Sequence, residues 1–188
     1  QIECMAVLIP REGEASAITL WLDRAYVERE CGLPTHGYHF PRESLVGKVI
    51  ELIRAGGHAE PRIGFERYFV DFPVYDGLRK AFPESGFVGA ADLFYRLRSV
   101  KEPQEVEFIR RASVAACSGM EAAIKAVRPG VKELDILAEA EYAMLKAGSG
   151  GSSFRPQVVS GERALLTHPV ASNKAIAPGE VVVIHLGA

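Results

Sequence analysis

The stretch that decides the fold lies at 154–188, FRPQVVSGERALLTHPVASNKAIAPGEVVVIHLGA. Near its end, residues 181–186 form a β-branched and apolar run behind the turn-forming pair Pro178-Gly179. Such a run is typical of a β-strand that is buried on both faces. We therefore expect His185, which lies inside the run, to point into the protein and away from water.

A second histidine lies upstream in the same stretch. His168 precedes Pro169 and follows a turn predicted at Ser160-Gly161, and the residue before a proline favours an extended backbone. The extended segment should carry the imidazole of His168 toward the region of His185. The sequence thus predicts one candidate site that contains both imidazoles.

Composition and charge narrow the function classes. The chain has 188 residues, 48% of them hydrophobic, which is enough to bury one core or two small ones and argues against disorder. Its 22 basic and 24 acidic residues give a net charge of -2, and they are scattered without a block of one sign. We therefore expect neither nucleic acid nor a membrane surface as partner. No apolar run approaches the roughly 18 to 20 residues that span a bilayer.

The cysteines give no sign of a disulfide framework or a structural zinc site. Cys4, Cys31 and Cys117 are odd in number, widely spaced and without a CxxC pattern. A reducing, cytoplasmic setting is the expectation that follows.

The first half of the chain alternates between strand and helix patterns. A β-hairpin is predicted from two apolar runs on either side of the turn at 10–13, and a helix ends at Gly56-Gly57. The alternation predicts a small α/β domain with a mixed sheet. The expected strands are 4–9, 17–22, 62–65 and 86–89, and the expected helices are 45–53 and 74–82.

The second half begins with two amphipathic helices. Pro103 suits the first position of a helix, and apolar residues recur with a period near 3.6 from there to the Pro129-Gly130 turn. A second stripe of the same period runs through 134–145 and ends at Gly148. Both stripes are predicted to pack against a sheet.

Several motifs, in this order, resemble the creatinase and Xaa-Pro aminopeptidase family. The resemblance implies an α/β (α+β) fold with a creatinase-type N-terminal domain at 1–97, whose start is missing, and the first half of a pita-bread catalytic domain at 98–188. The motifs are RSVKEPQE at 98–105, RPGV at 128–131, SFRPQVVSG at 153–161, THP at 167–169 and PGEVVVIHLGA at 178–188.

The resemblance assigns roles to two side chains. His168 matches the histidine that lines the active site of the family, contacts the substrate and stabilises the charge that develops during amide hydrolysis. An imidazole suits that role because its unperturbed pKa near 6.5 lets it donate a proton at neutral pH. Phe154 is expected to bind substrate by shaping the floor of the same site.

His185 stands where metal-using members carry an aspartate, the first of five ligands shared by two divalent ions. From the family we expect two divalent ions, Mn, Co or Zn, and His185, at the position of the first aspartate ligand, is a candidate metal ligand. A neutral imidazole offers one nitrogen and no charge, so a two-metal site should be weakened. The open alternative is that His185 is a buried, hydrogen-bonded histidine in a site that has lost its metal. The other family ligands are expected beyond Ala188.

Three functions follow from the resemblance. The leading one is an Xaa-Pro dipeptidase or aminopeptidase that hydrolyses the C–N bond of a small peptide. The second is a metal-free creatinase-like hydrolase of a small amidino compound, and the third is a non-catalytic binding module with a pita-bread fold. The resemblance also implies a homodimer in which the first domain of one subunit borders the active site of the other.

Overall fold

The computed structural model describes residues 5–66 and 70–188. The chain forms two compact units, Gln1–Ser99 and Val100–Ala188. Both contain helices and strands, which confirms the mixed class expected from the sequence. Each unit is described by itself below.

The first unit is built around a three-stranded mixed sheet. β1 (Ala6–Leu8) pairs antiparallel with β2 (Ser16–Leu20), which confirms the predicted hairpin. β3 (Thr35–Tyr38) pairs parallel with β2, and a parallel pair needs a crossover connection. Helix α1 (Arg24–Cys31), which follows the short turn η1 (Trp21–Asp23), provides it.

A second, two-stranded sheet completes this unit, whereas the sequence predicted one mixed sheet. β4 (Ile63–Phe65) pairs parallel with β5 (Phe87–Gly89), and helix α3 (Phe72–Ala81) lies between them in the chain. Helix α2 (Leu45–Ala55) begins where the Ser44 hydroxyl accepts a hydrogen bond from Gly47 N, and α4 (Ala91–Ser99) ends the unit. The buried core consists of Ile18, Tyr38, Val49, Ile53, Leu78 and Phe82.

The second unit opens with the two predicted helices, α5 (Pro103–Ala126) and α6 (Glu133–Lys146). Pro103 is the first residue of α5, and Glu102 before it forms a capping box with Glu105 in the first turn. The two helices pack closely at Gly119, where an added Cβ would lie 2.5 Å from Met144 Cγ. No helix in the described part of the chain is both long and apolar enough to cross a membrane.

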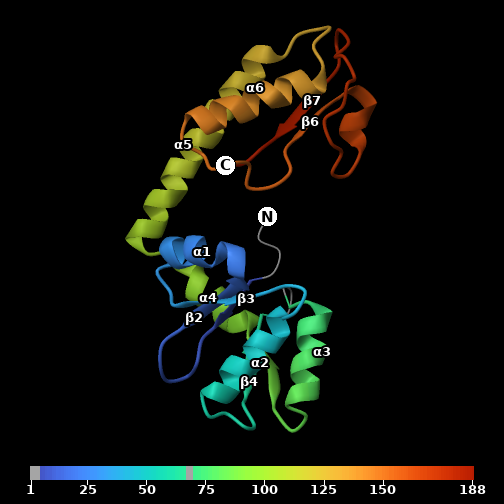
Figure 1. Cartoon of the computed structure of the whole chain (residues 1–188). Helices are drawn as coiled ribbons and strands as arrows, with labels where there is room; N and C mark the ends of the chain where they lie inside the picture. Colours follow the sequence, from blue (N-terminus) through green and yellow to red (C-terminus); the bar gives the residue numbers. More distant parts are fainter. Residues whose placement is uncertain (1–4, 67–69) are drawn as a thin grey trace. The chain divides into compact units, whose positions relative to one another are not determined.

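A two-stranded antiparallel sheet packs on these helices (Figure 1). β6 (Gln157–Ser160) pairs with β7 (Val182–His185), so that Val158 lies opposite Ile184 and Gln157 opposite His185. Alternate residues of a strand point to opposite faces. Val182 and Ile184 therefore face the core, whose buried members are Ala123, Ile136, Ala140, Val158 and Ile176.

The expectation that His185 points into the protein is wrong. His185 is exposed, and so is Val183, which lies on the same face of β7. The reason is that helices cover only one face of the β6–β7 pair within the described residues. An apolar, β-branched run therefore forms a strand buried on one face and open on the other.

Candidate functional site

A buried carboxylate organises the polar side chains of the second unit. Glu133, in the first turn of α6, is fully buried. Its Oε1 accepts hydrogen bonds from Ser160 N at 2.8 Å and from Ser160 Oγ at 3.1 Å. Its Oε2 accepts from Ser172 N at 3.0 Å, from Ser172 Oγ at 2.8 Å and from Arg163 Nε at 3.3 Å. Five donors thus surround one carboxylate.

Burial and hydrogen bonding act in opposite directions on the pKa of the Glu133 carboxyl. Burial raises the pKa of the Glu133 carboxyl, because a charge loses its hydration inside a protein. The hydrogen bonds from Ser172 and Ser160 together outweigh burial and hold the pKa below its ordinary value. Glu133 is therefore ionised when folded, and the guanidinium of Arg163 balances its charge.

The backbone ties the start of α6 to the same region. Lys132, which precedes the helix, gives no side-chain cap, so the first amides of α6 need other acceptors. Glu133 N donates to Lys174 O at 3.0 Å, and Leu134 N donates to Ser172 O at 3.1 Å. The segment around Ser172 thus caps the helix with its carbonyls while its own amide and hydroxyl bind the Glu133 carboxylate.

A lysine and a second carboxylate extend the arrangement. Lys174 Nζ donates to Ser160 Oγ at 2.8 Å and also to the carboxylate of Glu180. The hydrogen bond from Lys174, together with the one from Ala177 N, lowers the pKa of the Glu180 carboxyl. We call the whole set the Glu133 network; it consists of Glu133, Ser160, Arg163, Ser172, Lys174 and Glu180.

His168 lies in a segment enclosed by this network. The segment starts with the short helical turn η2 (Gly161–Leu165) and ends at Ser172. His168 is exposed and has φ = 53°, which makes it the one non-glycine residue of the described ranges with a positive φ. The sequence predicted an extended backbone from Pro169. The left-handed conformation found instead is one that histidine tolerates better than most residues, and such residues cluster at functional sites.

Phe154 and His185 lie against each other on the open face of the sheet. Their ring centroids are 4.5 Å apart with an interplanar angle of 37°. Gly187 leaves room for the phenyl ring, because a Cβ at that position would lie 2.7 Å from Phe154 Cε1. The structure therefore joins two of the three residues that the sequence singled out, and no hydrogen bond or ring contact links His168 to them within the described residues.

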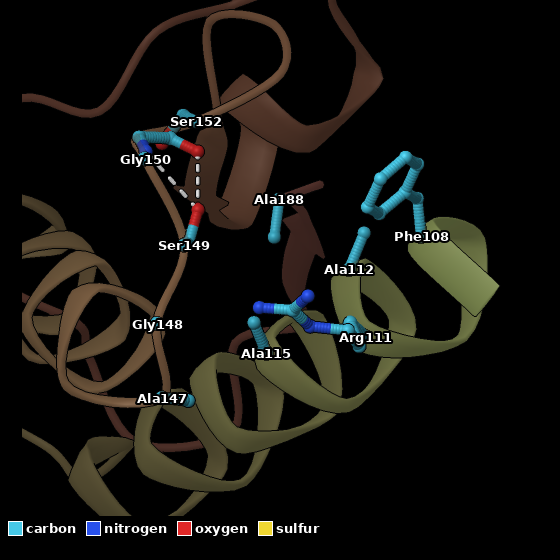
Figure 2. A pocket seen from close by; sticks show the side chains of 11 residues that line it. Phe108, Arg111, Ala112, Ala115, Ala147, Gly148, Ser149, Gly150, Ser152 and Ala188 are labelled. Carbon is cyan, nitrogen blue, oxygen red and sulfur yellow. Dashed lines mark hydrogen bonds between the residues drawn. The ribbon is translucent and has the colours of Figure 1, made fainter. Parts of the chain in front are cut away.

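An open pocket of about 480 Å³ lies elsewhere in the second unit (Figure 2). It is formed by α5 and the glycine-rich turn after α6, and Arg111 is the only charged side chain among its lining residues. Neither His168, His185 nor Phe154 lines it. The shared cavity for two imidazoles that the sequence suggests remains a prediction.

The described residues alone do not form a metal centre. No group of three or more His, Cys, Asp and Glu side chains that could hold a metal ion occurs among them. His185 lies beside Phe154, and the acidic side chains of the Glu133 network already bind serine, lysine and arginine donors. The side chains present therefore do not fit a two-metal site by themselves.

Comparison with known proteins gives the family. Residues 3–100 match the model of the creatinase/prolidase N-terminal domain, and residues 107–188 match that of metallopeptidase family M24. The chain belongs to the creatinase and M24 metallopeptidase family. The resemblance seen in the sequence motifs is confirmed.

Individual members of the M24 family show how far the match extends. An Xaa-Pro dipeptidase of Pyrococcus furiosus is 38% identical over 97 residues, which are 52% of this chain and 28% of that protein. The solved X-Pro aminopeptidase of Thermotoga maritima has a TM-score of 0.83 at 27% identity, covering 97% of this chain and 49% of that one. The Xaa-Pro dipeptidase of Bacillus anthracis has a TM-score of 0.77 at 28% identity, covering 97% and 50%. The chain therefore spans about half the length of these solved M24 structures.

Sequence reasoning missed the Glu133 network. An acidic residue in the first turn of a helix is ordinarily explained by the helix dipole, so Glu133 gave no sign of burial. Ser160 and Ser172 come from separate segments on either side of His168, and no spacing rule predicts that one carboxylate binds both. Only Ser160 lies in one of the family motifs, at 153–161, and nothing in the sequence linked it to Glu133 or Ser172.

Proposed function

We propose that the protein acts as an Xaa-Pro peptidase of the M24 family, hydrolysing the C–N bond before proline in a small peptide. The observation that carries the proposal is the match of both family domains in order, with Xaa-Pro dipeptidases and aminopeptidases among the relatives. A second support is the exposed imidazole of His168, which lies in a segment anchored at both ends and is accessible to a substrate.

His168 is the residue to which we assign the chemistry. A neutral peptide carbonyl acquires negative charge as water attacks it, and the leaving nitrogen needs a proton. An imidazole can donate a hydrogen bond to the first and a proton to the second. The left-handed backbone of His168 directs the ring from a segment that both ends hold in place.

His185 favours a second candidate function. The family aspartate is absent at this position, and the imidazole lies against Phe154 in a region without further metal-binding side chains in the described ranges. The alternative is a metal-free, creatinase-like hydrolase in which His168 is the main acid-base group and an amidino compound is the substrate. In this alternative Phe154 and His185 would form part of the substrate surface.

Turnover measurements distinguish these proposals. The intact protein would be incubated with Xaa-Pro dipeptides and, separately, with creatine, before and after chelation with EDTA and re-addition of Mn²⁺, Co²⁺ or Zn²⁺. Dipeptide hydrolysis that disappears on chelation and returns with metal supports the peptidase. Hydrolysis of creatine that survives chelation supports the alternative, and the absence of both leaves the non-catalytic binding module.

The substitution His168→Ala tests the assigned residue. It should lower kcat by about 10² to 10⁴, the usual range for one acid-base group. Near-normal turnover in this variant would contradict the role proposed for His168, whichever substrate is used.

We also propose a homodimer, which rests on the family resemblance, and a cytoplasmic setting, which rests on the cysteine pattern. Cys31 and Cys117 are free and exposed. Sedimentation equilibrium of the intact protein should give twice the subunit mass. A single monomer mass at micromolar concentration would contradict the dimer.

A further inference from the structure

We propose that Glu133 is a positioning residue: it holds His168 in place and affects turnover through His168. The inference rests on the proposed function, in which His168 contacts the substrate. It assigns to a buried side chain of α6 the task of fixing both ends of the exposed segment 161–172.

The two oxygens of the Glu133 carboxylate bind opposite ends of the segment. Oε1 binds the amide and hydroxyl of Ser160, immediately before the segment, and Oε2 binds the amide and hydroxyl of Ser172 at its far end. Arg163, inside the segment, donates from Nε to Oε2 and from a terminal nitrogen to Val170 O. The Glu133 side chain thus binds Ser160 and Arg163 at the start of the segment and Ser172 at its end.

A carboxylate is the side chain that this arrangement requires. All five groups around Glu133 are donors, and an ionised carboxylate is the one common side-chain group that only accepts. Because Glu133 is fully buried, water does not compete for these bonds. Hydrogen bonds to a charged acceptor are also stronger than neutral ones. The loop ends are therefore held rigidly.

His168 depends on this support because its own side chain has none. Within the described residues the imidazole makes no hydrogen bond, ion pair or ring contact. Its left-handed backbone is unfavourable for a residue with a Cβ and persists only where the surroundings impose it. The anchors at Ser160, Arg163 and Ser172 restrain the segment, together with backbone hydrogen bonds such as Gly161 N to Val181 O at 3.0 Å.

A double-mutant cycle tests the proposal in the intact protein. Glu133→Gln, His168→Ala and the double variant would be assayed with an Xaa-Pro dipeptide well below their unfolding temperatures. Glu133→Gln should lower kcat by about 10²-fold with KM nearly unchanged, because small misplacements of a reacting group have effects of that size. In the His168→Ala background it should change kcat less than about twofold, since the group that it positions is gone.

The matched control is Glu141→Gln, on the same helix. Glu141 also accepts a hydrogen bond from a serine, Ser152 Oγ at 3.0 Å, but does not touch the His168 segment. Its kcat should stay within about twofold of the wild type. The proposal would be overturned if the effects of Glu133→Gln and His168→Ala on kcat multiply in the double variant. It would also be overturned if Glu133→Gln alone leaves kcat unchanged.

A milder variant and a structural measurement keep the proposal open to refutation if Glu133→Gln does not fold. Ser172→Ala removes the hydroxyl, which donates to Glu133 Oε2 and accepts from Lys174 N, and keeps the bond from the Ser172 amide to Glu133. The imidazole resonances of His168 in ¹H–¹⁵N spectra should broaden or shift in Ser172→Ala and stay unchanged in Glu141→Gln. Unchanged resonances in Ser172→Ala would contradict positioning. Turnover that survives His168→Ala would instead contradict the proposed function. The imidazole resonances of His168 in Ser172→Ala would then still test whether the Glu133 network positions His168.

Discussion

Replacing Glu133 with glutamine should lower the free energy of unfolding of the second unit by about 3 to 5 kcal/mol. The substitution keeps the shape of the side chain and removes its charge. It therefore separates the electrostatic and hydrogen-bonding role of Glu133 from its packing. The size of the effect follows from the donors that surround the two carboxylate oxygens.

The amide oxygen of the introduced glutamine can keep the two bonds from Ser160, but its NH₂ group would then face Arg163 Nε and Ser172 N, which are donors themselves. A buried donor without a partner costs about 1 to 3 kcal/mol, and a hydrogen bond to a charged group contributes about 1.5 to 3 kcal/mol. The Arg163 side chain is 33% exposed, so water can replace its lost bond. The unpaired Ser172 amide should account for most of the loss.

The effect should depend on pH with a defined sign. The folded pKa of Glu133 lies below its ordinary value of 4.5, so the ionised carboxyl adds stability that is fully present above that value. This contribution is lost as the pH falls through the lower, folded pKa. The difference in stability between the wild type and Glu133→Gln should therefore be constant from about pH 6 to 8 and shrink below about pH 4.5.

Urea denaturation followed by circular dichroism measures the change. Fluorescence of Trp21, the single tryptophan, reports the first unit and identifies its transition in the same curves. Glu141→Gln serves as the control and should lose less than about 1 kcal/mol, because its one serine bond is only partly buried. A loss below about 1 kcal/mol in Glu133→Gln, or one that grows toward low pH, would refute the reasoning.

Substitutions at three further positions test the packing of α5 on α6, the cap of α2 and the open face of the β6–β7 pair. Gly119→Ala should destabilise the second unit by about 1 to 3 kcal/mol, seen as a lower urea midpoint, because its Cβ would overlap Met144; an unchanged midpoint would show that the helices can separate without cost. Ser44→Ala should cost about 1 kcal/mol in the Trp21-reported transition, because it removes the cap of α2, whereas Ser44→Asp should restore most of it. Gly187→Ala should displace the Phe154 ring and so shift the His185 imidazole resonances, which depend on the ring 4.5 Å away; identical spectra would contradict this packing.

Periodic patterns predicted most of the regular elements. The apolar stripes of α5 and α6, the proline that starts α5 and the hairpin of β1 and β2 were all visible, because each depends on residues close in sequence. Strand β3 was missed because Thr35–Tyr38 contains Gly37 and no alternating pattern. The structure explains that glycine, since a Cβ there would lie 2.8 Å from the Trp21 ring.

The candidate site was predictable only in part. The family motifs identified His168, Phe154 and His185, and the contact between the last two follows from the register of β7 and the space left by Gly187. The burial of His185 was predicted wrongly, because an apolar run does not reveal how many faces of a strand are covered. Glu133 could not be predicted, because its partners Ser160 and Ser172 meet it only through tertiary packing.

The open face of the β6–β7 pair affects how readily the purified chain self-associates. Val181 and Val183 are 70% and 38% exposed, and β7 has one paired neighbour among the described strands. A strand with a bare apolar side and free backbone groups is a template for aggregation. Purified as these 188 residues alone, the polypeptide should self-associate as its concentration rises. Exchanging Val183 for threonine or lysine should delay the onset of light scattering, which makes that position the natural first choice for a better-behaved sample.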